Sequence, residues 1–287
     1  MIKNIYFSLL LIAGLMLTAC SSDDNVSEQA PKTYYMTVDA TKGVNEAASP
    51  AYRRALNLSG STLSASWATT EHVYVQITAL DTKEYWFNGS LQPQSAGVTT
   101  QLSGALSVPD KWAYPTIEEA MTNGVFELPI YMLLQFPRPD FLDYTGQVGT
   151  IDDIAAKYDY ATAIALIDDI NGNVITATSP VTFVNQQAIV KFTLKDKADG
   201  TTLLNPTVLT INVEGDLSGD YPLTLTIPAS TYTTNSNGVL YVAIPGFSGE
   251  TVTLTATCSS GTYTYTKSYA TFVNGKYYEI TVKMTKQ

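Results

Sequence analysis

The fold class is decided by the stretch Tyr34-Tyr35-Met36-Thr37-Val38 near the start of the chain. Successive side chains of a β-strand point to opposite faces, so Tyr34, Met36 and Val38 would share one apolar face. The same period of two recurs at residues 73–77, 189–194, 208–213, 223–227, 239–244 and 252–256. Thr, Ser, Tyr and Val are abundant and favour strands as well. We therefore expect an all-β protein.

Helical signals are few and short. Residues 116–119 (Thr-Ile-Glu-Glu) and 150–153 (Thr-Ile-Asp-Asp) each place a hydroxyl three residues before a carboxylate. This is the spacing of a capping box, in which the hydroxyl accepts a backbone hydrogen bond at the start of a helix. The patterns that follow run for only about two turns, so we expect short connector helices on a β framework.

The spacing of turns suggests two domains. Asn171-Gly172 and Asn274-Gly275 each lie between strand-like runs and predict hairpins. Longer loops and both helix signals come before Thr178, whereas evenly spaced strands with tight turns follow it. We expect two β-sandwich domains, at residues 34–178 and 179–287.

The first residues have the pattern of an export signal. Lys3 precedes an apolar run at residues 5–17, which ends in Leu17-Thr18-Ala19-Cys20. This ending resembles the lipobox of bacterial lipoproteins, and the resemblance implies a signal peptide at 1–19 and acylation of Cys20. The alternative is an ordinary secretory signal with a chance cysteine. Several acyl chains on Cys20 would anchor the protein durably in a membrane.

Residues 20–33 are predicted to form an acidic tether. The segment Ser21-Ser22-Asp23-Asp24-Asn25 is polar and offers nothing to bury. It resembles the export tags that send some lipoproteins to the outer face of the outer membrane, although a plain linker is the alternative. The expected location is therefore the outer membrane and the cell surface.

The net charge argues against two classes of partner, and the cysteine content argues against disulfides. The formal net charge is −10, which argues against nucleic acid and anionic membrane surfaces as partners. Of the two cysteines, Cys20 is assigned to lipid, so Cys258 has no partner within the chain. A disulfide framework is therefore not expected.

Catalytic and metal-binding patterns are not evident. His72 is the single histidine and starts a strand-like run, where a structural or solvated role is more common than catalysis. Asp168-Asp169 could hold calcium with Asn171 and Asn173, but the spacing matches no calcium loop and a solvated turn is preferred. We expect no enzymatic activity, no metal and no cofactor.

Arg53-Arg54 stands out because the whole chain has only 16 lysines and arginines. The pair follows a low-complexity stretch at residues 43–50 and precedes Ala55 and a strand-like run. A dibasic site in an exposed loop is a substrate for trypsin-like proteases. An incidental charged turn is the alternative.

Taken in order along the chain, several features resemble the fimbrillin family, the lipoprotein pilins of Gram-negative anaerobes. They start with the lipobox, the acidic tail, the first strand and an arginine before Ala55-Leu56-Asn57-Leu58. Further segments follow at 60–67 (GSTLSASW), 73–75 (VYV), 92–97 (QPQSAG), 99–104 (TTQLSG), 183–192 (FVNQQAIVKF) and 274–282 (NGKYYEITV).

The resemblance implies two transthyretin-like β-sandwich domains and assembly with other fimbrial subunits into a fimbrium. An arginine-specific maturation protease would cut between Arg54 and Ala55. The first strand, with Tyr34, Met36 and Val38, would then leave a groove for a strand of the next subunit. On the residues themselves, a sheet that lacks one strand is primed for strand addition.

The best donor strand in this chain is its C-terminal segment. Tyr278, Ile280, Val282 and Met284 form an apolar row with the same period of two. This segment could equally be no more than the last strand of its own domain. The chain is short for a main shaft subunit, so a tip or accessory role stays open, and so does the absence of any polymer.

Two other functions are weighed against the pilin. A surface glycan-binding lipoprotein of β-sandwich type could use exposed aromatic side chains such as Trp67, Trp86 and Trp112 and would not polymerise. A glycoside hydrolase would need a pair of carboxylates, and nothing in the sequence singles one out. The hydrolase therefore ranks last.

Overall fold

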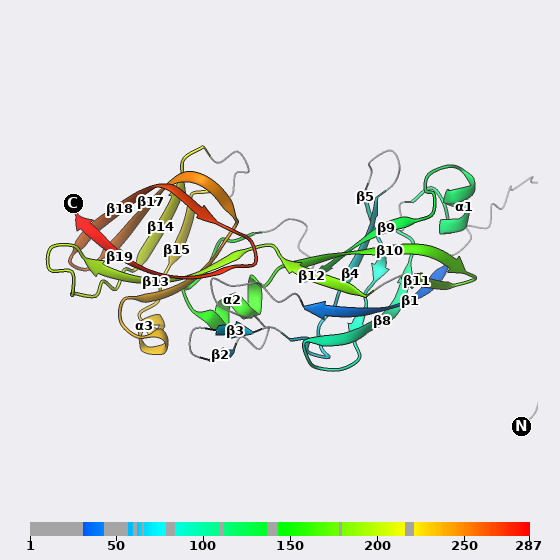
Figure 1. Ribbon diagram of the computed structural model, residues 1–287, viewed down its shortest axis with the longest axis horizontal. Helices are drawn as coiled ribbons and strands as arrows, with labels where there is room; N and C mark the ends of the chain where they lie inside the picture. Colours follow the sequence, from blue (N-terminus) through cyan, green and yellow to red (C-terminus); the bar gives the residue numbers. More distant parts are fainter. Residues whose placement is uncertain are drawn as a thin grey trace, which may run out of the picture. The chain divides into compact units, whose positions relative to one another are not determined.

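The computed structural model describes residues 31–42, 57–59, 62–64, 66–78, 84–109, 112–136, 143–177, 180–215 and 221–287. Within these ranges the chain forms two large sheets, one short strand pair and three short helices (Figure 1). The predicted all-β fold class with a few short helices is confirmed. No helix among the described residues is long and apolar enough to cross a membrane.

The first sheet has ten strands, with β1 near its middle. Along the main path the order is β5-β4-β9-β10-β11-β1-β8-β6, while β12 pairs with β1 and β10, and β7 pairs with β8. The strands are β1 (Thr33–Lys42), β4 (Tyr74–Thr78), β5 (Glu84–Trp86), β6 (Asn88–Gly89), β7 (Gln92–Pro93), β8 (Thr99–Ser107), β9 (Ile130–Phe136), β10 (Ala161–Asn171), β11 (Val174–Ala177) and β12 (Val181–Asn185). The expected hairpin at Asn171-Gly172 joins β10 to β11.

The second sheet has seven strands in the order β15-β14-β17-β18-β19-β13-β16. They are β13 (Ala188–Asp196), β14 (Val208–Val213), β15 (Leu223–Thr226), β16 (Val239–Ile244), β17 (Phe247–Cys258), β18 (Gly261–Phe272) and β19 (Tyr277–Lys286). All seven strands contribute buried residues to one core cluster. A separate pair joins β2 (Asn57–Ser59) to β3 (Thr62–Ser64).

The two predicted helices are α1 (Ile117–Thr122) and α2 (Ile151–Lys157). The hydroxyl of Thr116 accepts a hydrogen bond from the backbone N–H of Glu119 at 3.0 Å, which caps α1. Thr150 caps α2 in the same way, through the backbone N–H of Asp153 at 3.2 Å. A third helix, α3 (Ser230–Asn235), has no side-chain cap and gave no capping signal in the sequence.

Each large sheet has its own hydrophobic core, and the chain crosses between the cores more than once. Tyr144, Ile154 and Tyr160 lie before β10 yet pack in the core of the second sheet. Val181 and Phe183 of β12 pack in the core of the first sheet, because β12 pairs with β1 and β10. The expected division after residue 178 thus falls between two strands of the first sheet, and the last change of core comes after Asn185.

Candidate functional site

The first strand is bordered on both sides. β1 pairs antiparallel with β8 from Thr33 to Thr41. On its other side it runs parallel to β11 at residues 35–37 and to β12 at residues 40–42. Figure 1 shows β1 between β8 and β11. Loss of β1 would therefore leave a slot with two unpaired strand edges, which we call the β1 slot.

The inner face of β1 is buried along its length. Tyr34 and Met36 are 0% exposed, Val38 is 3% exposed and Ala40 is 2% exposed, whereas Tyr35 on the other face is 55% exposed. Burying Met36 and Val38 stabilises the fold by roughly 1.5–3 kcal/mol each. β1 therefore stays seated unless another strand replaces it.

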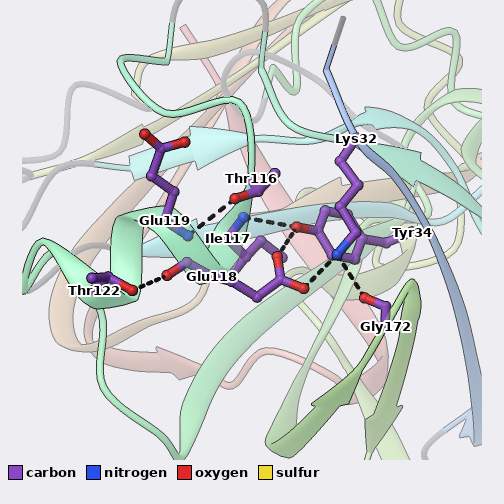
Figure 2. Close-up of polar contacts among 8 residues, drawn as sticks. All are labelled: Lys32, Tyr34, Thr116, Ile117, Glu118, Glu119, Thr122 and Gly172. Carbon is purple, nitrogen blue, oxygen red and sulfur yellow. Dashed lines mark hydrogen bonds and ion pairs between the residues drawn. The ribbon is translucent and has the colours of Figure 1, made fainter. Parts of the chain in front are cut away.

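A polar contact holds the first end of β1 (Figure 2). The hydroxyl of Tyr34 donates to Glu118 Oε2 at 2.5 Å and accepts from the backbone N–H of Ile117 at 2.8 Å. Lys32 Nζ lies 2.5 Å from Glu118 Oε1 and donates to the carbonyl of Gly172 at 2.7 Å. The N-terminal turn of α1 thus provides a socket for a tyrosine hydroxyl, which we call the hydroxyl socket.

The hydroxyl socket changes the pKa values of both of its acids. Burial, followed by the hydrogen bond to Glu118, raises the pKa of Tyr34 well above its usual range. For Glu118, burial acts to raise the pKa, but hydrogen bonds from Lys32 and Tyr34 outweigh it and lower the pKa. At neutral pH the socket therefore holds a protonated Tyr34 and an ionised Glu118.

A buried charge cluster holds the other end of β1. Lys42 Nζ lies 3.3 Å from Glu71 Oε2 and 3.9 Å from Asp159 Oδ2. The same nitrogen lies over the rings of Trp67 and Phe136, at 4.6 Å and 4.5 Å from their centroids. Lys42 is 4% exposed and Glu71 is 3% exposed. We call the two carboxylates and two rings around Lys42 the ammonium socket.

The candidate donor strand β19 is an internal strand of the second sheet. It pairs parallel with β13 over eight positions, from Tyr277 to Met284. Val282 and Met284 are buried, while Tyr278 and Ile280 are partly buried against the same core. In the fully described range 221–287, β19 meets β18 at only two residue pairs, both near its C-terminal end.

A cavity of about 310 Å³ lies where β18 and β19 diverge. Its lining includes Tyr265, Phe272, Tyr278, Ile280 and Val282. The side of β19 that faces β18 is thus incompletely packed. The strand is held mainly by its pairing with β13 and by the burial of its last two apolar side chains.

Several residues predicted from the sequence lie outside the described ranges or away from the β1 slot. Cys20, Arg53, Arg54 and Ala55 are outside the described residues. His72 is exposed, and its Nδ1 lies 2.8 Å from the hydroxyl of Ser90. Among the described residues, no group of three or more His, Cys, Asp or Glu could hold a metal ion.

The tryptophans proposed for sugar stacking differ in exposure. Trp67 is buried in the first core and contacts Phe136 and Phe183 edge-on, so it cannot stack on an external sugar. Trp86 and Trp112 are half-buried, and Trp112 packs against Phe126.

The ammonium socket escaped prediction from the sequence. Lys42 lies at the same parity as Tyr34 and Val38, which places it on the buried face of β1. The period of two could therefore have predicted that the side chain of Lys42 lies on the buried face. Glu71 and Asp159 are far away in the chain, and only the fold brings them to Lys42.

Comparisons with known proteins give structural neighbours only. No protein-family model matches the chain, and no curated protein matches it. A fimbrial assembly protein from Parabacteroides distasonis is 12% identical with a TM-score of 0.44, covering 87% of this chain and 91% of the other. The tip fimbrial protein Mfa3 from Porphyromonas gingivalis, with a C-terminal truncation, is 8% identical with a TM-score of 0.42, covering 88% and 95%.

A fimbrial protein from Bacteroides ovatus is 9% identical with a TM-score of 0.38, and the match covers 90% of this chain. The chain spans 50% of the length of that protein. Likenesses of this degree do not decide the function.

Proposed function

We propose that the chain is a subunit of a surface fimbrium that assembles by replacement of its first strand. It is exported as a lipoprotein and anchored to the outer membrane through Cys20. An arginine-specific protease cuts after Arg54, which separates β1 from the rest of the chain. A strand of another subunit then occupies the β1 slot.

The observation that carries this proposal is the position of β1. The strand is bordered by β8 on one side and by β11 and β12 on the other, and its inner face is fully buried. An empty slot of this kind exposes unpaired backbone groups on two edges and an apolar floor, which favours the addition of a strand. Arg53 and Arg54 lie in the sequence between β1 and β2, so a cut there separates residues 20–54 from the rest, and β1 is the one described strand in that piece.

The first test replaces Arg53 and Arg54 together by Ala. The wild-type precursor is expected to give a new N-terminus at Ala55 and a ladder of heat-resistant polymers after treatment with an arginine-specific protease. The double variant is expected to remain an uncleaved monomer, because β1 cannot leave while it is covalently attached. N-terminal sequencing and gel electrophoresis without boiling measure both results.

Arg138 provides the matched control, because it is the chain's remaining arginine and precedes Pro139. The variant Arg138→Ala is expected to be cleaved and to assemble like the wild type. Protease-dependent ladders from the Arg53/Arg54 double variant would show that cleavage at this site is not the trigger.

Glycan binding remains the second candidate, and one observation favours it. The cavity beside β18 is lined by aromatic side chains, and Tyr269 at its rim is 86% exposed. Aromatic rings that surround an open apolar cavity can stack on sugars. Retention of an uncleaved monomer on polysaccharide gels, lost in Tyr269→Ala, would support this function.

A further inference from the structure

The two strands β1 and β19 share a sequence pattern. Both are ten residues long, and they align without a gap as TYYMTVDATK (Thr33–Lys42) and YYEITVKMTK (Tyr277–Lys286). The identical pairs are Tyr34 and Tyr278, Thr37 and Thr281, Val38 and Val282, Thr41 and Thr285, and Lys42 and Lys286. Three of these pairs lie on the face that β1 buries.

The pattern matches the two sockets at the ends of the β1 slot. In β1, Tyr34 fills the hydroxyl socket and Lys42 fills the ammonium socket, eight residues further along. In β19, Tyr278 and Lys286 have the same spacing and the same parity. A strand with this spacing can fill both sockets at once, whereas a strand shifted by two residues fills neither.

We propose that the β1 slot selects its incoming strand through these two sockets and that β19 of a second copy of this chain is that strand. Lys286 of the donor lies between Glu71 and Asp159 of the acceptor. Tyr278 of the donor takes the hydrogen bonds of Tyr34. This inference rests on the proposed function and adds to it the register and the residues that decide which strand is accepted.

Desolvated charge is the physical reason for the selection. When β1 leaves, Glu71 and Asp159 lose the ammonium group of Lys42, which lies beside them and over the rings of Trp67 and Phe136. Buried carboxylates are strongly destabilising when a cation is removed from beside them. A strand that carries lysine at the matching position restores the pair, and a strand with a neutral residue there does not.

The apolar positions between the sockets fit the same register. Val282 replaces Val38, and Ile280 replaces Met36 with a side chain of similar volume. Met284 is larger than Ala40, and its flexible thioether is the apolar side chain that adapts best to irregular space. The alignment therefore places no charged or polar side chain of β19 on the apolar floor of the slot.

Substitution of Lys286 tests assembly at a position where the stability of the monomer is expected to stay the same. Lys286 is exposed in its own sheet, as is Lys283 on the opposite face of the same strand. The variants Lys286→Met and Lys283→Met therefore make the same chemical change at two exposed positions of β19. Thermal unfolding should show the same midpoint for both monomers.

Assembly of the protease-treated full chain then separates the two variants. Lys283→Met is expected to assemble like the wild type. Lys286→Met is expected to form polymer roughly tenfold more slowly, because its strand brings no ammonium group to Glu71 and Asp159. Lys286→Arg should restore most of the rate. Equal assembly by Lys286→Met and the wild type would overturn the selection by charge.

The register is tested by crosslinking, in a background with Cys258 replaced by Ser. The hydroxyls of Thr37 and Ser103 lie 3.1 Å apart across β1 and β8, so Thr281 of the donor should lie opposite Ser103. The pair Ser103→Cys with Thr281→Cys is expected to give disulfide-linked polymers, and Ser103→Cys with Glu279→Cys is not. The reverse result would overturn the register.

Failure of the proposed function gives a different outcome. If the cleaved wild type does not polymerise at all, strand replacement itself is wrong, and this inference is wrong with it. The wild type could instead polymerise while Lys286→Met assembles equally well and Ser103→Cys crosslinks to Glu279→Cys rather than to Thr281→Cys. In that case strand replacement stands and selection by the two sockets is wrong.

Discussion

Lys42 carries a charge into the core of the first sheet and illustrates how one residue can fix the end of a strand. Its ammonium group contacts two carboxylates and two aromatic faces, while its stem continues the buried face of β1. A buried ion pair adds little stability compared with apolar packing, but removal of one partner is costly. The cluster therefore acts mainly as a constraint on which residue can occupy this position.

The first residue-scale prediction concerns Lys42→Met in the uncleaved chain. The variant is expected to lose about 3–5 kcal/mol of unfolding free energy, because Glu71 and Asp159 stay buried while the ammonium group of Lys42 beside them is removed. Urea unfolding followed by tryptophan fluorescence measures the change, and the exposed Lys283→Met serves as the control. An unchanged unfolding midpoint would show that the cluster does not hold β1.

The second residue-scale prediction concerns pH. Because the pKa of Glu118 is lowered in the folded state, its contribution to stability is present above its ordinary pKa and is lost as the pH falls through the lowered value. Glu118→Gln should therefore lose less stability than the wild type between neutral pH and about pH 3.

Glu119→Gln is the matched control for this measurement, because Glu119 is exposed on the same turn of α1 and makes its described contact with Thr116 through the backbone. It should show the pH dependence of the wild type. If all three proteins lose the same amount of stability, the hydroxyl socket does not depend on the charge of Glu118.

At the scale of elements, β1 and β19 differ in how they are held. β1 has neighbours on both sides along most of its length, whereas β19 has one long neighbour, β13, and a short contact with β18. β19 nevertheless contributes Val282 and Met284 to the second core. If β19 is the donor strand, it must therefore leave its own sheet before it enters another subunit, because it is not a free tail.

Deletion of residues 277–287 tests this view of β19. The truncated chain is expected to lose the cooperative unfolding of its second sheet, because three buried side chains (Tyr277, Val282 and Met284) and eight paired positions disappear together. Near-ultraviolet circular dichroism and hydrogen exchange in β13 measure the loss. A truncated monomer with native spectra would show that β19 is a dispensable appendage.

The sequence predicted where strands and helices lie better than it predicted which strands pair with each other. The period of two located Tyr34, Met36 and Val38 on a buried face, and hydroxyl-to-carboxylate spacing located α1 and α2. The helix α3 escaped because its cap is Ala229, which has no side-chain acceptor. Local patterns also could not assign β12 to the first sheet, because its pairing with β1 joins residues about 140 positions apart.

At the scale of the whole molecule, the export signal predicted from residues 1–20 would decide where the fold operates. Replacement of Cys20 by Ala is expected to move the protein from the membrane fraction to the soluble fraction, because Cys20 is the residue proposed to carry the acyl chains. Detergent phase partitioning of wild type and variant measures the shift. Identical partitioning of the two proteins would contradict the lipoprotein assignment.

The two-sided border of β1 also has a mechanical consequence. When tension acts along the strand, the backbone hydrogen bonds on both sides are loaded together in shear and must break almost at once. A strand attached at one edge and pulled from its end can instead peel, one bond after another. A junction built in the β1 slot should therefore bear drag along a fibre far better than an edge-to-edge contact of the same length.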